Sequence, residues 1–317
     1  MLTPSRRRVI RQRLMQALPV LVLATFVVFG LLKLMPGDIA ITLAGENATE
    51  ERIHEIRELY GLNQPFLVQY GQWLFNAVQG HLGRSLASGE EVVTSIARSF
   101  PNTLLIVAMA ISIALLVGVP LGILAASRPD SLVDRAVTAI ASLGIAVPNF
   151  WLAMILVSWL ALEFWWFPAT GSHPFGDDPL KAIQHATLPA VALASGGISE
   201  VSRQLRSSLV ESLSSQQVRT LHAKGLTPAA ILWKHGLKNV GVNLLTVTTL
   251  LFNRMLAATV VVEAVFAIPG MGNLIVNGAL TRDLPVVQGV VFVMVLVVIA
   301  VNLAADILYT VLDPRID

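Results

Sequence analysis

The 317-residue sequence contains no cysteine, which excludes disulfides, thiolate-bound metal ions and cysteine nucleophiles. Charge is also scarce. Asp, Glu, Lys and Arg make up 13% of the residues, about half of the roughly 25% that soluble domains carry. Hydrophobic residues make up 55%, and the mean hydropathy is +0.70. These proportions indicate an integral membrane protein.

Motifs of several enzyme classes are absent as well. There is no G-x-x-x-x-G-K-[ST] loop, so the chain cannot bind ATP through one. Neither hydrolase pattern, H-E-x-x-H or G-x-S-x-G, occurs, and the six histidines form no H-x-x-x-H pair that would hold a metal. The net charge is only +2, and the basic residues are distributed as membrane topology requires. We therefore expect no nucleic-acid-binding surface. We expect no catalytic residue, metal or cofactor in this chain.

Six apolar segments are long enough to cross the hydrocarbon core, which takes about 20 residues of helix. They are 15–36, 101–127, 135–160, 185–207, 239–263 and 285–311. The first is long for the apolar part of a signal peptide, and no A-x-A-like cleavage site follows it, so we expect an uncleaved span. The fourth is rich in Ala, Gly and Ser and contains Glu200, so we expect it to pack inside the helix bundle.

Loop charges orient these spans, because cytoplasmic loops are enriched in Lys and Arg. The tail 1–14 has five arginines and no acid, and the stretch 203–238 has six basic residues against Glu211 alone. By contrast, 37–100 has eight acidic residues and four arginines. We therefore expect both termini, including the tail 312–317, in the cytoplasm and 37–100 outside, which requires an even number of spans.

The external segment 37–100 is long enough to contain helices of its own. Residues 48–60 predict a short helix that ends at Gly61, and 66–78 predict an amphipathic helix that can lie along the membrane surface. The remainder, 101–311, is expected to form a five-helix core that includes a cytoplasmic loop at 208–238.

A polar, basic stretch within that loop has the turn chemistry of two short helices joined by an elbow. Gly225 suits the left-handed position that closes the first helix. Thr227 is a good N-cap for the second, and Pro228 fits its first turn. A rigid elbow on the cytoplasmic side of a membrane domain can pass force from a soluble motor into the bilayer.

The R-x-x-x-A-K-G-L motif at 219–226 and the H-x-L-K-N form at 235–239 resemble the coupling loop, or EAA loop, of ABC importer permeases. The resemblance is to the B-type membrane subunit of the dipeptide/oligopeptide/nickel branch and covers nearly the whole chain. Further matching motifs stand in the same order at 17–19, 35–38, 60–65, 83–86, 101–104, 203–211, 263–272, 283–289 and 302–315. A proline common after the H-x-L-x-N element is absent, which leaves open whether the fifth span bends at its start.

The resemblance implies an all-α protein with six transmembrane helices in the bundle of a type I ABC importer permease. It implies a bacterial inner-membrane location, surrounding membrane lipid, and no enzymatic activity in this chain. The expected partners are a homologous second permease, two ATP-binding subunits that hold ATP and Mg, and an extracytoplasmic substrate-binding protein. The residues expected to couple to the ATPases are Arg219, Ala223, Lys224, Gly225, Leu226, Thr227, Pro228, His235, Lys238 and Asn239.

Charged residues within spans are costly and suggest a role in the translocation pathway or in gating. Glu200 and Arg203 can pair at (i, i+3) in the fourth span. Glu200 is the candidate contact for a peptide amino group, whereas Asp306 is better explained by a structural polar network. The expected substrate is a short peptide.

Several alternatives remain open on the sequence. The same machinery can import nickel chelates, glutathione or another small solute. A proton-relay subunit that uses Glu163, Glu200 and Asp306 is an alternative from another class, although three distant acids are few for a relay.

Overall fold

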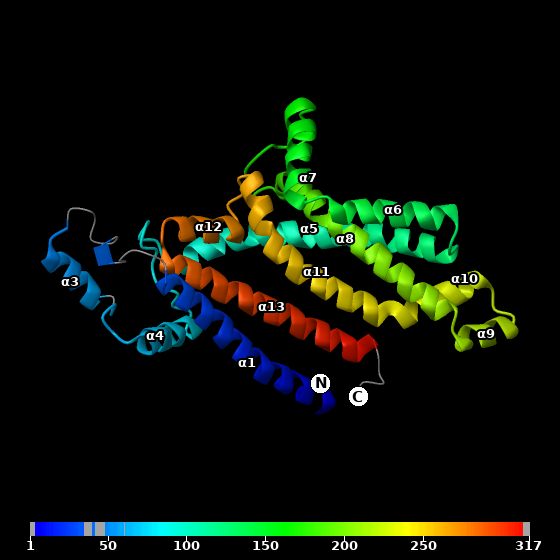
Figure 1. Cartoon of the computed structure of the whole chain (residues 1–317), viewed down its shortest axis with the longest axis horizontal. Helices are drawn as coiled ribbons and strands as arrows, with labels where there is room; N and C mark the ends of the chain where they lie inside the picture. Colours follow the sequence, from blue (N-terminus) through cyan, green and yellow to red (C-terminus); the bar gives the residue numbers. More distant parts are fainter. Residues whose placement is uncertain (1–3, 35–39, 42–47, 60, 313–317) are drawn as a thin grey trace. The chain divides into compact units, whose positions relative to one another are not determined.

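The computed structural model describes residues 4–34, 40–41, 48–59 and 61–312 (Figure 1). Within these ranges it is helical, and the β pairing consists of one isolated bridge between Arg84 and Glu91. The expectation of an all-α protein is confirmed. The motifs at 35–38 and 313–315 lie outside the described residues.

The chain divides into two compact units. The first unit comprises Met1–Ile10, Pro101–Gly272 and Val301–Asp317, and the second comprises Arg11–Phe100 and Asn273–Ala300. Helices α1 (Pro4–Lys33), α5 (Val92–Ser127), α12 (Met271–Leu280) and α13 (Leu284–Leu312) contribute residues to both. Each unit is described by itself below.

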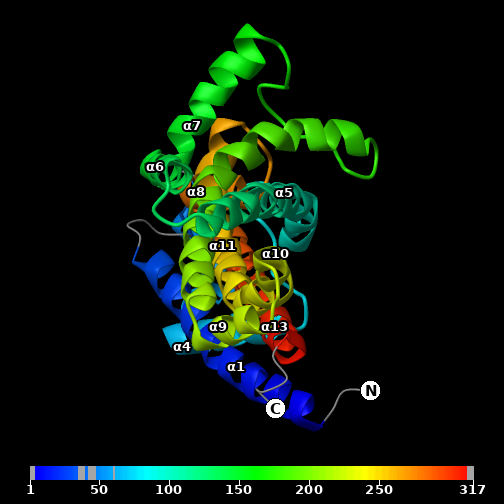
Figure 2. The ribbon, with the colours of Figure 1, turned by 90° about the vertical axis from the view of Figure 1, so that its right-hand side faces the viewer.

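The first unit is built around a helix of 35 residues, α8 (Pro179–Leu213), which begins at the cap Asp178. Its other elements are α6 (Leu132–Ala146), α7 (Asn149–Leu156), the π-helix η1 (Val157–Glu163), α9 (Gln216–Ala223), α10 (Pro228–Ala230), the π-helix η2 (Ile231–Gly236) and α11 (Leu237–Val265). Helices α5, α6 and α11 lie alongside α8 (Figures 1 and 2).

Small residues allow these helices to approach α8 closely. An added Cβ at Gly122 of α5 would lie 2.8 Å from the Ser202 carbonyl oxygen, and one at Gly118 would lie 2.9 Å from that of Ile198. On α6, an added Cβ at Gly144 would lie 2.2 Å from the Ser199 hydroxyl. Close backbone approach through small residues is how membrane helices associate. The expectation that the fourth apolar segment packs inside the bundle is confirmed.

The third apolar segment, expected over 135–160, is not one helix. Helices α6 and α7 meet at a bend of 93° between Ala146 and Asn149. Val147 is extended, with φ −81° and ψ 120°, as expected of a residue before proline, because Pro148 disfavours the helical region there. Figure 1 shows α7 standing away from the line of α6.

The second unit contains α3 (Glu50–Leu59) and α4 (Phe66–Val78). The helix expected over 66–78 is confirmed at both ends. The helix expected over 48–60 agrees with α3, although Tyr60 lies outside the described residues. Gly61, the expected end of the helix, has a left-handed backbone with φ +61°. Helix α4 was expected on the membrane surface, and it packs its aromatic side chains against α1. The rings of Tyr70 and Phe26 lie 5.2 Å apart, and Tyr70 Oη donates to the Val22 carbonyl at 2.9 Å.

An aspartate joins two motifs of the second unit that are distant in sequence. Asp283 accepts hydrogen bonds from the Ser85 hydroxyl at 2.5 Å and from the Leu86 backbone N–H at 3.0 Å. These contacts hold the loop 83–91 against the start of α13.

Four helices of the described part are long and apolar enough to cross a membrane: Met15–Lys33, Val92–Ser127, Pro228–Val265 and Leu284–Thr310. The bent pair of α6 with α7 and η1 raises the number to five if it forms one span. Helix α8 is long enough but is not among them, and it contains five charged residues. A total of six spans therefore stays a prediction.

Two matched glycine substitutions test the packing of α8. Gly122→Ala places a methyl group against the Ser202 carbonyl oxygen, and we expect it to lower the free energy of unfolding by about 1–3 kcal/mol. Gly241→Ala lies in α11 with nothing within 4 Å of the added carbon, and we expect about 0.5–1 kcal/mol of stabilisation from helix propensity. Thermal unfolding in detergent measures both. Equal shifts for the two variants would contradict the packing argument.

Candidate functional site

The predicted elbow is formed by α9, a four-residue turn and α10. Ser215 caps α9 by accepting a hydrogen bond from the Val218 backbone N–H at 3.4 Å. At the other end Gly225 has φ +81°, the left-handed conformation that the sequence predicts. Its N–H donates to the His222 carbonyl at 2.9 Å, and the Leu226 N–H donates to that of Leu221 at 3.2 Å. This pair of hydrogen bonds is a Schellman motif, which closes α9 with a defined exit direction.

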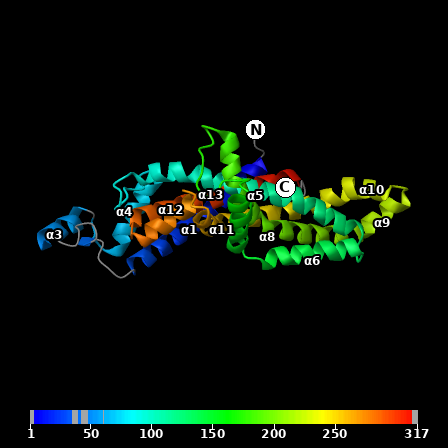
Figure 3. The ribbon, with the colours of Figure 1, turned by 90° about the horizontal axis from the view of Figure 1, so that it is seen from above.

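The second half of the elbow begins as predicted and continues into a candidate span. Thr227 Oγ1 accepts a hydrogen bond from the Ala230 N–H at 3.3 Å, and Pro228 occupies the first helical position. From there α10, η2 and α11 run on without a break as the 38-residue helix Pro228–Val265. The start of the fifth span contains the short π-helical stretch η2, and the helix is uninterrupted there. Figure 3 shows α9 and α10 beside each other at the ends of α8 and α11.

The elbow presents a basic surface anchored by two apolar side chains. Val218 and Ile231 are only 2% and 1% exposed, whereas Trp233 is 63% exposed. No acidic residue occurs in 216–239. Two of the predicted coupling residues, Leu226 and His235, are half-buried. The other eight are exposed: Arg219, Ala223, Lys224, Gly225, Thr227, Pro228, Lys238 and Asn239. Such a surface can bind a protein groove that presents carboxylates or carbonyl groups.

The structure also positions Glu200, in a cavity between α8, α11 and the bend after α6. The cavity has a volume of about 340 Å³ and is lined by Glu200, Arg203 and Arg254, among others. Glu200 forms an ion pair with Arg254 of α11, and the two side chains are 26% and 64% exposed. The expected pair of Glu200 with Arg203 is therefore replaced by a pair between helices. Arg203 lines the same cavity.

Asp306 does not line that cavity. It lies half-buried on α13, one turn from two residues that hydrogen bond to α11. Asn253 Nδ2 donates to Asn302 Oδ1 at 3.4 Å, and Tyr309 Oη donates to Thr246 Oγ1 at 2.8 Å. These contacts agree with a structural polar network around Asp306.

A third acid, Glu263 near the end of α11, is fully buried. Its carboxylate accepts a hydrogen bond from the Thr103 hydroxyl at 2.6 Å, and Thr103 in turn accepts one from the Met271 N–H at 2.8 Å. An added Cβ at Gly270 would lie 2.3 Å from the Glu263 carboxylate. The sequence motifs at 101–104, 263–266 and 268–272 are thus parts of one enclosure around a carboxylate.

Two residues of this region escaped the sequence interpretation. Arg254 is a basic residue inside an apolar segment. Because a charge within a membrane span is costly, Arg254 could have been singled out on the same ground as Glu200. Trp233 lies at the end of the short helix expected to dock on the ATPase, but its exposure was not predicted. In the part of the chain that the structure describes, no group of three His, Cys, Asp or Glu side chains can hold a metal ion.

Comparisons with known proteins cover almost the whole chain. Residues 118–317 match the family model described as "Binding-protein-dependent transport system inner membrane component". Residues 6–108 match the model of the N-terminal part of such membrane components.

Individual relatives agree with these matches. A protein of Brucella abortus named as a peptide transport system permease is 40% identical over 97% of this chain and 98% of its own. The oligopeptide transport system permease AppB of Bacillus subtilis is 36% identical over 98% of each chain. A structure of the MetNI methionine ABC transporter, in an inward-facing conformation, has a similar fold. It covers 69% of this chain and 96% of its own, with a TM-score of 0.58 and 18% identity.

A double-mutant cycle tests the ion pair between α8 and α11. Arg254→Gln leaves the Glu200 carboxylate without its partner, and we expect a loss of about 1 kcal/mol in the free energy of unfolding. Adding Glu200→Gln to this variant removes the uncompensated charge. We expect the double variant to recover most of the lost free energy of unfolding. Arg203→Gln, in the same cavity, is the control and should change little. Additive effects of the Glu200 and Arg254 substitutions would show that the pair contributes nothing.

Proposed function

Because the chain belongs to the family of binding-protein-dependent transport system inner membrane components, we propose that it is the permease subunit of an ABC importer for short peptides. The observation that carries this proposal is the exposed basic elbow, which is continuous with a candidate membrane span. The peptide substrate rests on the relatives named for peptide transport.

The elbow is the proposed contact with an ATP-binding partner subunit. Helix α10 and η2 dock in a groove of that subunit, and Arg219, Lys224 and Lys238 face its carboxylate or carbonyl groups. The cap hydrogen bonds at Gly225 and Thr227 support this role, because they define the angle between α9 and α10. A fixed angle transmits a push from the ATPase, whereas a flexible loop would absorb it.

Transmission into the membrane follows from the continuity of the helix. The elbow at Pro228 and the ion-paired Arg254 lie on the same uninterrupted 38-residue helix. A movement of the elbow therefore moves Arg254 relative to Glu200 on α8. It also moves Glu263, which lies farther along the same helix. We propose that this displacement opens and closes the pathway, with ATP hydrolysis on the partners as its energy source.

The proposed assembly contains this chain, a homologous permease, two ATP-binding subunits and an extracytoplasmic substrate-binding protein. Both termini and the elbow face the cytoplasm, as the arginine-rich tail 1–14 and the basic stretch 203–238 favour. Chelated nickel and glutathione remain alternative cargoes for the same machinery. The positions of the acids argue against a proton relay, because neither Glu163 nor Asp306 lines the cavity that contains Glu200.

We further propose that Glu200 contacts the peptide α-amino group in the cavity between α8 and α11, with Arg254 as its partner in the empty state.

Substitution of Gly225 tests the coupling role. Proline fixes φ near −65° and removes the N–H that donates to His222, so Gly225→Pro distorts the elbow while the apolar helices stay intact. In the full complex in lipid, we expect delivery protein loaded with dipeptide to stimulate the ATPase of the wild type. Gly225→Pro should assemble but lose at least nine-tenths of that stimulation.

Gly225→Asn is the matched control, because asparagine tolerates a left-handed backbone. It is expected to keep most of the stimulation. If loaded delivery protein stimulates the ATPase of the Gly225→Pro complex as much as that of the wild type, the coupling role of the elbow is refuted. Stimulation by another solute and not by peptides would leave the mechanism standing and refute the peptide substrate.

Glu200→Gln tests the pathway contact. Removing the charge that binds a peptide ammonium group is expected to slow uptake of Ala–Ala into proteoliposomes about tenfold, whereas Arg203→Gln should change it less than twofold. Uptake is measured with saturating loaded delivery protein. Unchanged uptake by Glu200→Gln would remove this residue from the pathway.

A further inference from the structure

Helix α4 of the second unit carries three stripes of side chains, because residues three and four positions apart share a face of a helix. The first stripe packs inward: Phe66, Tyr70, Trp73 and Ala77. The second stripe is polar: Gln69, Gln72, Asn76 and Gln79. The third stripe is apolar and exposed: Leu67, Gly71, Phe75 and Val78. The described part of the chain leaves this third stripe uncovered, and the coupling mechanism uses no residue of α4.

The inward stripe places α4 beside the interior of a membrane span. Tyr70 Oη donates to the Val22 carbonyl of α1 at 2.9 Å, and it lies 2.9 Å from the Thr25 hydroxyl. Both partners lie well inside the candidate span Met15–Lys33, and Val22 is about 16 Å along the helix from Lys33. These bonds satisfy the tyrosine hydroxyl at a depth where water is absent. The inward side of α4 therefore lies at the level of the hydrocarbon core.

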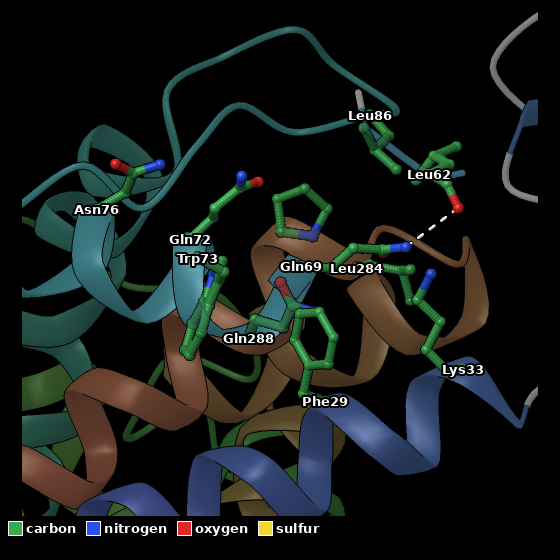
Figure 4. Close-up of a pocket in the computed structure, with 11 residues that line it drawn as sticks. Phe29, Lys33, Leu62, Gln69, Gln72, Trp73, Asn76, Leu86, Leu284 and Gln288 are labelled. Atoms are coloured by element: carbon green, nitrogen blue, oxygen red, sulfur yellow. Dashed lines mark hydrogen bonds between the residues drawn. The ribbon is translucent and has the colours of Figure 1, made fainter. Parts of the chain in front are cut away.

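The polar stripe faces the other way along α1, toward its Lys33 end. Gln69, Gln72 and Asn76 line a cavity of about 300 Å³, and Lys33 lines the same cavity (Figure 4). Gln69 Nε2 also donates to the carbonyl of Leu62, in the loop before α4, at 3.0 Å. A lysine at the end of a span lies at the boundary between membrane and water. The polar side of α4 therefore lies near water, while its aromatic side reaches toward the middle of the span.

The exposed apolar stripe points in a third direction. Around the helix axis it is turned by about 120° from each of the other two stripes, so it faces away from α1 and from the polar cavity. Leu67, Phe75 and Val78 are 68%, 69% and 70% exposed, and a Cβ added at Gly71 would meet no atom of the described residues within 4 Å. No charged residue occurs in 66–78, whereas α3 has six within its ten residues. The stripe therefore offers apolar contact and neither charge nor hydrogen bonds.

The depth of α4 decides which neighbour fits this stripe. The span of α1 has only 11% of its most apolar window buried within the chain, and its Leu23, Val27 and Leu31 are exposed as well. These side chains need a hydrocarbon environment at the level where Tyr70 meets α1. A helix with one polar and one apolar side lies in the membrane interface, with its apolar side about 5–10 Å deep. Acyl chains therefore fit the exposed stripe, whereas a water-soluble partner would have to enter the membrane to reach it.

We propose that α4 lies in the leaflet around the Lys33 end of α1, with Leu67, Phe75 and Val78 among the lipid acyl chains. The sequence predicts a helix along the membrane surface. The hydrogen bonds to α1 place this helix deeper, and the three stripes define which side meets lipid. In the proposed topology this is the outer leaflet. The contact ties the external segment to the bilayer and needs no particular substrate, so it stands apart from the proposed function.

Nitroxide labels test this orientation. The chain has no cysteine, so a label on one introduced cysteine reports a single position. Phe75→Cys and Val78→Cys probe the apolar stripe, and Gln72→Cys and Gln79→Cys are the matched controls on the polar stripe. The complete transporter, with cysteine-free partner subunits, is labelled and placed in lipid nanodiscs. Electron paramagnetic resonance then compares collisions with oxygen, which dissolves in hydrocarbon, and with a nickel chelate, which stays in water.

At positions 75 and 78 we expect the oxygen collision rate to exceed the chelate collision rate about threefold or more, and at 72 and 79 we expect the reverse order. All four sites are exposed, so the labels leave the packing of α4 intact. Chelate collisions that dominate at 75 and 78 would place the stripe in water and overturn the inference. Low rates with both reagents would show a protein cover, such as the homologous permease, and overturn it too. Failure of peptide import would leave these rates unchanged, so the two proposals fail separately.

Discussion

The close approach of backbones along α8 is the constraint on which the first unit depends. Gly118 and Gly122 of α5 and Gly144 of α6 leave no room for a side chain against α8. On the other side, Gly197 of α8 faces the methyl group of Met255 on α11, the mobile end of a flexible side chain, so the approach there is less strict. Because lipid tails are as apolar as leucine, such contacts supply association that hydrophobic burial cannot supply inside a bilayer. Helix α8 can therefore carry polar residues that a lipid-facing helix could not.

The polar residues that this packing shelters connect helices in pairs. Arg206 of α8 bonds to Asp134 of α6, and Glu200 of α8 bonds to Arg254 of α11. The first pair involves a carboxylate side chain that is 3% exposed, whereas the second lies at a cavity with Arg254 64% exposed. A buried pair costs more to separate than a solvated one. The pair of Asp134 with Arg206 therefore ties α6 to α8 more firmly than the pair of Glu200 with Arg254 ties α8 to α11.

Most of the local structure followed from the sequence, because short-range chemistry decides it. The helix 66–78, the left-handed Gly225, the Thr227 cap and the interior position of α8 depend on neighbouring residues or on composition. Partners across helices could not be predicted in this way. Glu200 has Arg203 one turn away, and the structure pairs it with Arg254, 54 positions along the chain, because packing and not spacing sets which side chains meet. The 93° bend at Pro148 was also missed, since an apolar run does not reveal whether a proline kinks or breaks a helix.

The π-helical stretch η2 lies where the elbow becomes a span, and its position suggests what limits the movement of α11. Gly236, the last residue of η2, is buried against Leu209 and Leu213, which lie near the end of α8. An added Cβ at Gly236 would lie 3.4 Å from the nearest side-chain atom, that of Leu213. The helices are therefore packed less closely here than at Gly118 and Gly122. π-Helical turns are rare and are frequent at functional sites. This ordinary van der Waals contact leaves room for the base of α11 to shift against the end of α8 together with the elbow, whose caps at Gly225 and Thr227 stay fixed.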